Sequence, residues 1–491
     1  MNRVLIVYDD SKLPGEEIRA LVGSRRFGGI LIGKQSVFER MRAFFTFALP
    51  DAVLLTLGGR EAIPLLRERV AAEQSREGGR VRVLHFYSDS IDQNREAAAL
   101  VLRSAAFAER IYSARQDGRG VFCAFPGAEA YEGFLQRAEE AGGTGLLPQD
   151  EPTGEIRLRG DEFSWIGTQE GLVSSLTSKY DARYFNHLVS EEDIVTKSSA
   201  NIEKLRAEFR FWQLLPDDMK IWFVMPFDFR EDGDAASYRM ERLYLPNLAV
   251  KYVHGAMDGE EFESFLHKYF RFLGARASRP VTGEAYAARA EKLYVQKTRE
   301  RLDALKADPR FAPVAALIRD GTAYVDVDEA FERFCGIYRR TFGRCRPALC
   351  EVIGHGDACL SNILFDRASR TLKFIDPKGA LTEAELWTDP YYDLCKLSHS
   401  VLGLYDFFNS GLYELSLDDS MQFRLDVPFD NAPYAAALRK HMEANGFDYS
   451  MTRVGEAALF LSMLPLHIDN PHKVLGFFLN AMRILDELER E

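Results

Sequence analysis

The feature that most constrains this chain is a polar loop at 355–362, which lies between two short apolar runs typical of buried strands. A second loop at 375–379 follows the next apolar run. Asp357 precedes Asn362 by five positions, and Asp376 lies fourteen positions beyond Asn362, about the length of one hairpin. The spacing therefore predicts two acidic side chains and one carboxamide on neighbouring hairpin loops.

These residue types suit phosphoryl transfer from ATP. A carboxylate must accept the proton of the attacking hydroxyl, and oxygen ligands must hold Mg²⁺ against the β- and γ-phosphates. The catalytic loop of protein kinases has the pattern H-R-D-x-x-x-x-N with D-F-G after it, and this chain has H-G-D-x-x-x-x-N followed by I-D-P-K-G. The competing interpretation is a polar loop with a capping Asp and a turn Asn. A single HxD is common, whereas the joint pattern is not.

The segments HGDACLSNILF, FIDPKGA and DPYYDLCKLSHS resemble the aminoglycoside phosphotransferase and choline kinase-like family of small-molecule kinases. The resemblance is strong over 354–399, weaker over 163–350, and does not reach 1–150. It implies a bilobal protein-kinase-like fold that uses ATP and Mg²⁺ to phosphorylate a hydroxyl of a small molecule, such as a sugar, an amino alcohol or an amino acid.

The same resemblance assigns roles to individual residues. Asp357 matches the catalytic base of the family, and His355 matches the loop histidine that braces the loop. Asn362 and Asp376 match the magnesium ligands. Asp389 and Asp393 match aspartates at a helix start that support the catalytic loop or line the acceptor side; for Asp393, helix capping is an equal alternative.

A small β-rich lobe is predicted over 160–250. Strands are expected at 163–168, 180–189, 193–196, 221–229 and 237–245, with one helix at 201–215. A kinase-like site needs a lysine on a strand and a helix glutamate to orient it. Lys197 ends an expected strand, and Glu208 lies beside the apolar face of the helix, with Glu203 as its competitor. The alternative is that Lys197 and the helix glutamate form only a surface salt bridge without a role in a site.

Two further parts of a nucleotide site are expected in this lobe. The segment 167–176 is placed to cover phosphates, with Ser174 and Ser175 as hydroxyl donors, although it lacks the kinase G-x-G-x-x-G. The adenine edge is expected to meet backbone groups of a hinge that includes Met240, Glu241 and Leu243. Helices are expected in a large lobe over 251–491, at 260–273, 283–307, 327–342, 391–408, 432–445, 454–463 and 473–489.

The first 150 residues predict an α/β layer domain. Strands are expected at 4–8, 29–33, 52–57, 81–87 and 122–125, and helices at 61–72, 93–107 and 128–141. Asp9 and Asp10 follow the first strand, where α/β domains place ligand groups. The segment 27–34 faintly resembles sugar-phosphate nucleotidyltransferases, whose domains occur fused to choline kinase-like domains in bacterial surface-glycan pathways. The alternative is a folding and dimerisation module, which leaves a homodimer open. A linker is expected at 142–161.

Composition narrows the classes of partner. The chain has 62 Lys and Arg against 74 Asp and Glu, so its net charge of −12 disfavours a nucleic-acid binder. The six cysteines form no CxxC pair, and no run of about 18 apolar residues occurs, so a cytoplasmic protein without a membrane span is expected. Only twelve residues separate Asp376 from Asp389, too few for a long activation segment. A small-molecule acceptor is therefore favoured over a protein substrate.

Three functions follow as expectations. The first is the small-molecule kinase. The second is a nucleotide-binding pseudokinase or regulatory module, which would need no catalytic base. The third is a bifunctional kinase and nucleotidyltransferase, in which residues 1–150 would also be catalytic. The identity of the acceptor and the preference for ATP over GTP stay open.

Overall fold

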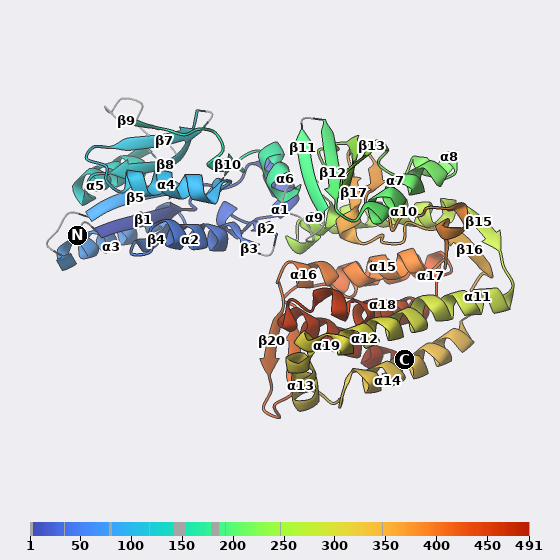
Figure 1. The fold of residues 1–491 in the computed structure, drawn as a ribbon. Coiled ribbons are helices and arrows are strands. Elements are labelled where there is room, and N and C mark those ends of the chain that lie inside the picture. Colours follow the sequence, from blue (N-terminus) through green and yellow to red (C-terminus); the bar gives the residue numbers. More distant parts are fainter. Residues whose placement is uncertain are drawn as a thin grey trace. The chain divides into compact units, whose positions relative to one another are not determined.

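The computed structural model describes residues 3–33, 35–77, 81–116, 118–141, 154–177, 186–191, 193–245, 247–345 and 347–490. Most of the linker expected at 142–161 lies outside the described residues, as does the start of the strand expected at 180–189. The chain is multidomain and divides into two units, Met1–Tyr180 with His254–Ala256, and Asp181–Val253 with Met257–Glu491 (Figure 1).

The first unit contains a six-stranded mixed sheet. β1 (Arg3–Asp9) pairs in parallel with β4 and with β5, which confirms the strands expected at 4–8, 52–57 and 81–87. The antiparallel pairing of β8 with β5 was not expected. The order across the sheet is β4 (Val53–Leu57), β1, β5 (Val81–Tyr87), β8 (Arg119–Phe125), β7 (Tyr112–Gln116) and β9 (Gly154–Arg157).

Helices cover both faces of this sheet. Alternate residues of a strand point to opposite faces, so Leu5 and Val7 pack in the core formed with α3 (Ile63–Glu77) and α5 (Ala128–Ala141). Tyr8 faces the other way, and its ring lies 6.3 Å from that of Phe45. Phe45 belongs to α2 (Val37–Ala48), which packs with α4 (Arg95–Ala105) on that face. The α/β layer architecture expected for this region is therefore confirmed.

Two expectations about the first unit are wrong. Residues 29–33 do not join the main sheet, because β2 (Leu31–Ile32) pairs only with β3 (Gln35–Ser36). The strand expected at 163–168 is the shorter β10 (Phe163–Trp165), which pairs with β6 (Ser90–Asp92) of the first unit. With α6 (Gln169–Thr177), residues 154–177 therefore belong to the first unit and not to a second domain that begins at 160. The remaining helix of this unit is α1 (Glu16–Val22).

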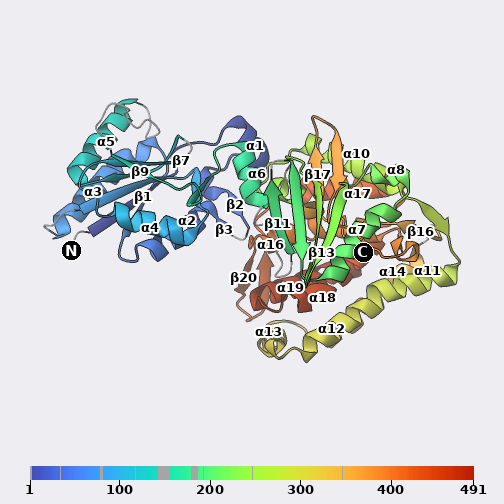
Figure 2. The same ribbon diagram turned by 45° about the horizontal axis from the view of Figure 1, so that its top comes forward.

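The second unit begins with a four-stranded antiparallel sheet in the order β11 (Asn186–Glu191), β12 (Ile194–Ser199), β14 (Ala235–Glu241) and β13 (Pro226–Asp232). β11, β12 and β13 are labelled in Figure 1, and β11 and β13 again in Figure 2. Asp232 ends β13, and Gly233 adopts a φ of 58°, a conformation that glycine accepts readily in the tight turn between β13 and β14. α7 (Ile202–Leu214) packs on this sheet through Leu205 and Phe209. Among the described residues this sheet has four strands and not five, because residues 163–165 pair with β6.

The remainder of the second unit is mainly helical. Its core is formed where α12 (Lys297–Ala307), α14 (Val327–Arg344), α18 (Tyr449–Met463) and α19 (Pro471–Arg490) pack together. The helix expected at 391–408 is broken at Leu404, whose φ is 56°, and the helix expected at 283–307 contains a π-helical stretch, η3 (Glu291–Gln296). The helices are α8 (Asp217–Lys220), α9 (Leu248–Val253), α10 (Gly259–Ala275), α11 (Gly283–Ala290), α12 (Lys297–Ala307), α13 (Ala312–Gly321), α14 (Val327–Arg344), α15 (Tyr392–Val401), α16 (Tyr405–Asn409), α17 (Ala432–Ala444), α18 (Tyr449–Met463) and α19 (Pro471–Arg490).

Short strands interrupt the helices and carry the polar loops. β16 (Cys350–Ile353) precedes the loop at 355–362, and the hairpin of β17 (Ile363–Asp366) and β18 (Thr371–Phe374) separates it from the loop at 375–379. This is the strand, loop and hairpin order expected from the sequence. The other short strands are β15 (Ser278–Pro280), β19 (Trp387–Thr388), β20 (Glu414–Leu417) and β21 (Phe423–Asp426). Among the described residues, no helix is both long and apolar enough to cross a membrane.

Candidate active site

A buried ion pair joins the sheet of the second unit to its helix. Nζ of Lys197, on β12, lies 2.6 Å from Oε2 of Glu208 on α7, and both side chains are buried. The hydroxyl of Tyr238 donates to the same Glu208 oxygen at 3.3 Å. The structure thus brings together the two residues that the sequence paired, and Glu203 is not the partner. Two charges in a dry environment need such compensation, because an isolated buried charge is costly.

Lys197 also contacts Asp376. Its Nζ lies 2.9 Å from Oδ1 of Asp376, whose side chain keeps 41% of its surface exposed. Burial alone would lower the pKa of Lys197, but Asp376, Tyr238 and Glu208 hold that pKa above the usual value of lysine, so the side chain is an ammonium. One cation therefore links a buried carboxylate to an accessible one.

The loop that carries Asp376 is locked against α7. Asp376 has a φ of 56°, and Gly379 has a φ of 89°. A Cβ at Gly379 would lie 2.8 Å from the carbonyl carbon of Ala207, so the backbone approaches α7 closely there. The N–H of Ala380 donates to the carbonyl of Ala207 at 3.0 Å. A glycine is needed at 379 for both reasons.

His355 joins the two polar loops. Its Nε2 lies 2.9 Å from the carbonyl oxygen of Ile375, and its Nδ1 accepts from the N–H of Asp357 at 3.1 Å. These partners require Nε2 to carry the proton, as in a neutral imidazole. Burial lowers the pKa of His355, which agrees with that neutral form. Two backbone hydrogen bonds complete the junction, from Ile375 N–H to Asn362 O at 3.1 Å and from Lys378 N–H to His355 O at 3.0 Å.

Asp357 and Asn362 contact each other within the first loop. Nδ2 of Asn362 donates to the carbonyl of Asp357 at 2.8 Å and to its Oδ2 at 3.2 Å. Because the amide nitrogen points to Asp357, the amide oxygen of Asn362 is the atom left for a cation. The side chain of Asp357 is 41% exposed, so its carboxylate is accessible.

Lys396 is a second partner of Asp357, and the sequence did not single it out. Its Nζ lies 2.8 Å from Oδ1 of Asp357, and its own side chain is only 14% exposed. Burial alone would lower the pKa of Lys396, but the Asp357 carboxylate and the Tyr392 phenol hold it above the usual value. The available signal was its position within DPYYDLCKLSHS, three residues after Asp393.

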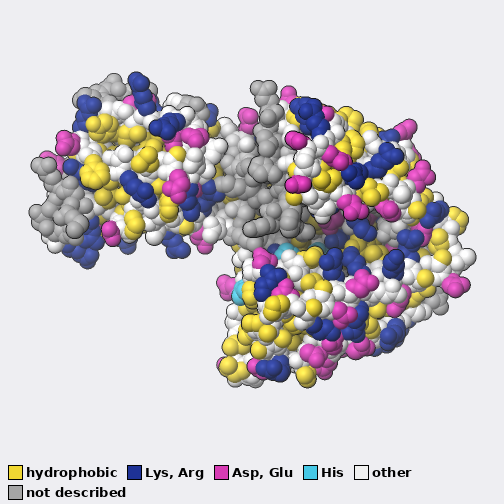
Figure 3. All heavy atoms as spheres, in the orientation of Figure 1, with side chains coloured by type: hydrophobic (Ala, Val, Ile, Leu, Met, Phe, Trp, Pro, Cys, Tyr) yellow, Lys and Arg dark blue, Asp and Glu magenta, His cyan; other side chains and the backbone are white. Residues whose placement is uncertain are grey.

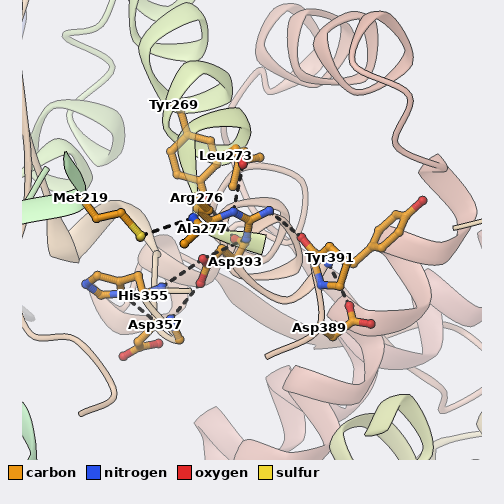
Figure 4. Close-up of polar contacts among 12 residues, drawn as sticks. Met219, Tyr269, Leu273, Arg276, Ala277, His355, Asp357, Asp389, Tyr391 and Asp393 are labelled. Atoms are coloured by element: carbon orange, nitrogen blue, oxygen red, sulfur yellow. Dashed lines mark hydrogen bonds and ion pairs between the residues drawn. The ribbon is translucent and has the colours of Figure 1, made fainter. Parts of the chain in front are cut away.

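Asp393 supports the loop through hydrogen bonds to its backbone and contacts Arg276, as Figure 4 shows. Its carboxylate accepts from the backbone N–H of His355 at 3.0 Å and of Gly356 at 2.8 Å. Arg276, from the end of α10, lies 3.2 Å from Oδ2 of Asp393, and both side chains are buried. The Asp393 side chain therefore contacts the backbone of the loop and lies away from solvent. Arg276 was missed because nothing in its local sequence distinguishes it.

Asp389 lies in a separate buried position. Its Oδ1 accepts from the hydroxyl of Tyr294 at 2.9 Å and from the N–H of Tyr391 at 2.8 Å. Burial raises the pKa of Asp389 above its ordinary value. This aspartate therefore fastens the start of α15 to the helix that contains Tyr294.

A column of rings connects α7 to the two loops. The ring of Phe211, on α7, lies 5.3 Å from that of Phe223, which stacks on His355 at 5.9 Å and 8°. His355 in turn lies 5.2 Å from Phe374, the last residue of β18. This packing couples the position of α7, and hence of Glu208, to the loop that holds Asp357.

Five other residues were expected at the site from the sequence, namely Ser174, Ser175, Met240, Glu241 and Leu243. Ser174 and Ser175 lie on α6 in the first unit, in a helix and not in a loop between two strands of the four-stranded sheet. Met240 and Glu241 end β14, and Leu243 follows in the segment toward α9. The interpretation of 167–176 as a loop between two strands of this sheet is therefore wrong, because most of the segment lies in α6 (Gln169–Thr177).

In the first unit, Asp9 and Asp10 at the end of β1 form hydrogen bonds with other residues of the same unit. Asp9 is buried, and its Oδ2 lies 3.0 Å from Nε2 of His85, whose Nδ1 lies 2.9 Å from the Tyr131 hydroxyl. Asp10 accepts from the N–H of Gly28 at 2.9 Å. Both carboxylates thus have structural contacts.

No family model and no curated protein matches the sequence. Among solved structures, the chain is similar to a thermostable mutant of aminoglycoside phosphotransferase APH(4)-Ia in its apo form, with 12% identity over 62% of this chain and 94% of that chain and a TM-score of 0.37. A GDP complex of a mutant aminoglycoside 2'-phosphotransferase-IIIa has 12% identity, covers 63% of this chain and 90% of that chain, and gives a TM-score of 0.37.

An aminoglycoside-3'-phosphotransferase of type VIII has 13% identity, covers 56% of this chain and 93% of that chain, and gives a TM-score of 0.32. These three structures are aminoglycoside phosphotransferases.

Proposed function

We propose that the second unit is an ATP- and Mg²⁺-dependent phosphotransferase that phosphorylates a hydroxyl of a small molecule. In this proposal the four-stranded sheet with α7 is the small lobe of a kinase-like fold, and the helical remainder is the large lobe. The observation that carries the proposal is the chain of contacts from Glu208 through Lys197 to Asp376, beside the loop of Asp357 and Asn362.

Lys197 is positioned to bind the α- and β-phosphates. Its ammonium is oriented by Glu208 at 2.6 Å, and it is held in its charged form by the surrounding acids. A charge-assisted hydrogen bond to a phosphate oxygen is among the stronger contacts in proteins. The backbone between Met240 and Leu243 is the segment we assign to the adenine edge.

The oxygen donors at the site fit a hard divalent cation. Asn362 turns its amide nitrogen toward Asp357, and Asp376 keeps an accessible carboxylate. Two oxygen ligands from the protein are what Mg²⁺ commonly takes when phosphates and water complete its shell. Asn362 and Asp376 would hold the ion, and when bound it neutralises charge on the β- and γ-phosphates.

Asp357 is positioned to act as the base. Its exposed carboxylate is oriented by Asn362 and Lys396. As the acceptor oxygen bonds to the γ-phosphorus, the bond from that phosphorus to the β-γ bridging oxygen breaks. The hydroxyl proton passes to a carboxylate oxygen of Asp357, and ADP leaves. His355, neutral and buried, only braces the loop.

The substitution Asp357→Asn tests the base. ADP release is followed with Mg-ATP and a panel of sugars, amino alcohols and amino acids, with the exposed Asp419→Asn as control. We expect Asp357→Asn to lose at least about 100-fold in turnover, because general-base catalysis contributes that much or more, while its unfolding curve stays close to that of the control. Undiminished transfer by Asp357→Asn would remove the assigned base. If Mg-ATP raises the Tm of the wild type but no acceptor is phosphorylated, the chain is a nucleotide-binding module.

Asp376→Asn tests the metal ligand separately. Asn tolerates the left-handed conformation at φ 56°, so the fold should be retained. At ATP about 100 times its Kd, binding stabilises the wild type by about 2.7 kcal/mol, measured as an increase in Tm. We expect most of this Mg²⁺-dependent increase to be lost in Asp376→Asn and kept in Asp419→Asn. An unchanged increase would show that Asp376 does not hold the ion.

A further inference from the structure

Three lysines contact the candidate base, its loop, or the helix α15 beside it. Lys396, on α15, pairs with Asp357 at 2.8 Å. Lys378 packs against the loop itself, because a Cβ placed on Gly356 would lie 2.7 Å from its Cβ. Lys297 begins α12, and its Nζ donates to the hydroxyl of Tyr392 at 2.9 Å. In Figure 3, Lys and Arg side chains gather over α15.

The helix geometry accounts for the position of Lys297. It directly follows the π-helical stretch η3, and π-turns within α-helices occur often at functional sites. Just before Lys297, Tyr294 reaches Asp389 at the start of α15. Nζ of Lys297 also lies 5.3 Å from the ring centre of Tyr392. Tyr392 and Lys396 are one helical turn apart on α15. The side chains of Lys297 and Lys396 therefore both lie beside Tyr392.

The positive charge of this cluster is not balanced within the described chain. Lys396 has Asp357 as its ion-pair partner, whereas neither Lys297 nor Lys378 forms an ion pair with any described carboxylate. Burial opposes ionisation of the Tyr392 phenol, yet Lys396, Lys297 and Lys378 together hold its pKa below the usual value. A cluster of cations with so few carboxylates attracts an anion.

The anion belongs either to the nucleotide or to the acceptor, and the positions of the lysines distinguish these two sources. Lys197 serves the nucleotide from the four-stranded sheet, and Lys396 meets whatever approaches Asp357, the transferred phosphoryl group included. Lys297 extends from the large-lobe helix α12 and is one tyrosine away from α15. Its partner is therefore more readily a group on the acceptor than a nucleotide phosphate.

We propose that the acceptor carries an anionic group, a carboxylate or a phosphate, that binds at Lys297 and Lys378 while its hydroxyl faces Asp357. This inference rests on the proposed phosphotransferase activity, which it deepens by naming a substrate class. An acidic sugar, a sugar phosphate or a hydroxy acid has this combination of groups. A cationic amino sugar or amino alcohol would instead meet repulsion from the cluster.

Matched acceptors test the charge preference. One set is glucose, glucosamine, glucuronate and glucose 6-phosphate, and the other is glycerol, ethanolamine, glycerate and glycerol 3-phosphate. Within each set, the neutral, cationic and acidic members are compared by ADP release from the full chain with Mg-ATP. We expect kcat/KM for the best acidic member of a set to exceed that of its neutral counterpart about tenfold or more, since a charge-assisted hydrogen bond is worth that factor. Equal or higher values for the neutral or cationic members would overturn the inference while leaving the phosphotransferase intact.

The Lys297→Met variant locates the effect, and Lys292→Met, an exposed lysine five positions earlier, is the matched control. Lys297→Met should raise KM for the acidic acceptor about tenfold with KM for ATP unchanged, and Lys292→Met should change neither. An unchanged acceptor KM in Lys297→Met would contradict the assignment.

A binding measurement keeps the two proposals distinguishable if no acceptor is phosphorylated. With Mg-AMP-PNP at saturation, glucuronate and inorganic phosphate are titrated against the full chain and the Tm is followed. A rise in Tm for the wild type and Lys292→Met, but not for Lys297→Met, would support the anion site even where transfer fails. No rise, or an equal rise in Lys297→Met, would overturn it.

Discussion

Oδ1 of Asp393 accepts a hydrogen bond of 2.8 Å from the backbone N–H of Gly356, a residue 37 positions earlier in the chain. Its other oxygen accepts from His355 and contacts Arg276. One buried carboxylate therefore holds the turn of the Asp357 loop and neutralises a buried guanidinium. This arrangement makes the geometry of the loop depend on a residue that does not itself face solvent.

Asp393→Asn should strongly destabilise the protein. The amide keeps the shape but places an N–H₂ against a backbone N–H and leaves Arg276 without its counter-charge. Breaking a buried ion pair in this way costs about 3–5 kcal/mol of unfolding free energy. Urea unfolding of Asp393→Asn, set against the exposed Asp419→Asn, measures the difference. A loss of unfolding free energy no larger than that of Asp419→Asn would mean that Asp393 does not stabilise the loop.

The pair of Lys197 and Glu208 should show strong coupling. Lys197→Met leaves Glu208 as a buried carboxylate with less compensation, and we expect a loss of about 3 kcal/mol in unfolding free energy together with loss of phosphoryl transfer. The double variant Lys197→Met with Glu208→Leu removes both charges and should recover much of the stability but none of the activity. Stability is measured by urea unfolding and transfer by ADP release. If the loss of unfolding free energy in the double variant equals the sum of the losses in the two single variants, the uncompensated charge of the buried pair is not the cause of the loss.

Two buried histidines should make stability fall in acid. Burial lowers the pKa of His355 and, more strongly, of His399, which lies between the rings of Tyr405 and Phe460 at 4.2 and 4.3 Å. An unfolded histidine takes up a proton below about pH 6.5, whereas the folded ones stay neutral. The unfolded state then binds more protons, so the stability that these residues contribute is present above about pH 6.5 and is lost as pH falls toward their folded pKa values.

The variant His399→Phe isolates one of these protons. Below about pH 6.5 each such histidine lowers the unfolding free energy by up to about 1.4 kcal/mol for each pH unit of acidification, so His399→Phe should reduce the slope between pH 6 and 5 by up to that amount. The aromatic ring keeps the stacking with Tyr405 and Phe460. Urea unfolding at several pH values gives the slopes, and exposed His267, substituted to Phe, is the control. Equal slopes in the wild type and His399→Phe would show that His399 takes up its proton in the folded state as well.

Local sequence pattern was sufficient for much of the candidate site. Lys197 and Glu208 were identifiable because a strand ending in lysine was followed by a helix with a clear apolar face, and the structure places them 2.6 Å apart. The hairpin of β17 and β18 was identifiable because the fourteen positions from Asn362 to Asp376 are about the length of one hairpin. In each case the signal lies within about fifteen residues, where periodicity reports the structure directly.

Local pattern failed where a partner came from far along the chain. The strand at 163–165 has the composition of a sheet strand, yet it pairs with residues 90–92 and so carries 154–177 into the first unit. Ser174 and Ser175 were misplaced for the same reason. Strand composition shows that a segment will pair but does not choose its partner, because register and pairing depend on which faces are buried together.

By itself, the sequence determined the residue types and the spacing of the two polar loops, because hairpin length and strand patterning are local properties. Tertiary structure alone decided that Lys396 meets Asp357, that Arg276 meets Asp393, and that Lys297 lies beside Tyr392. A charged side chain on a helix has no local signature for its partner. Its partner is chosen by the packing of whole helices, in which a buried charge is tolerated only where an opposite charge or a hydrogen-bonding group already lies.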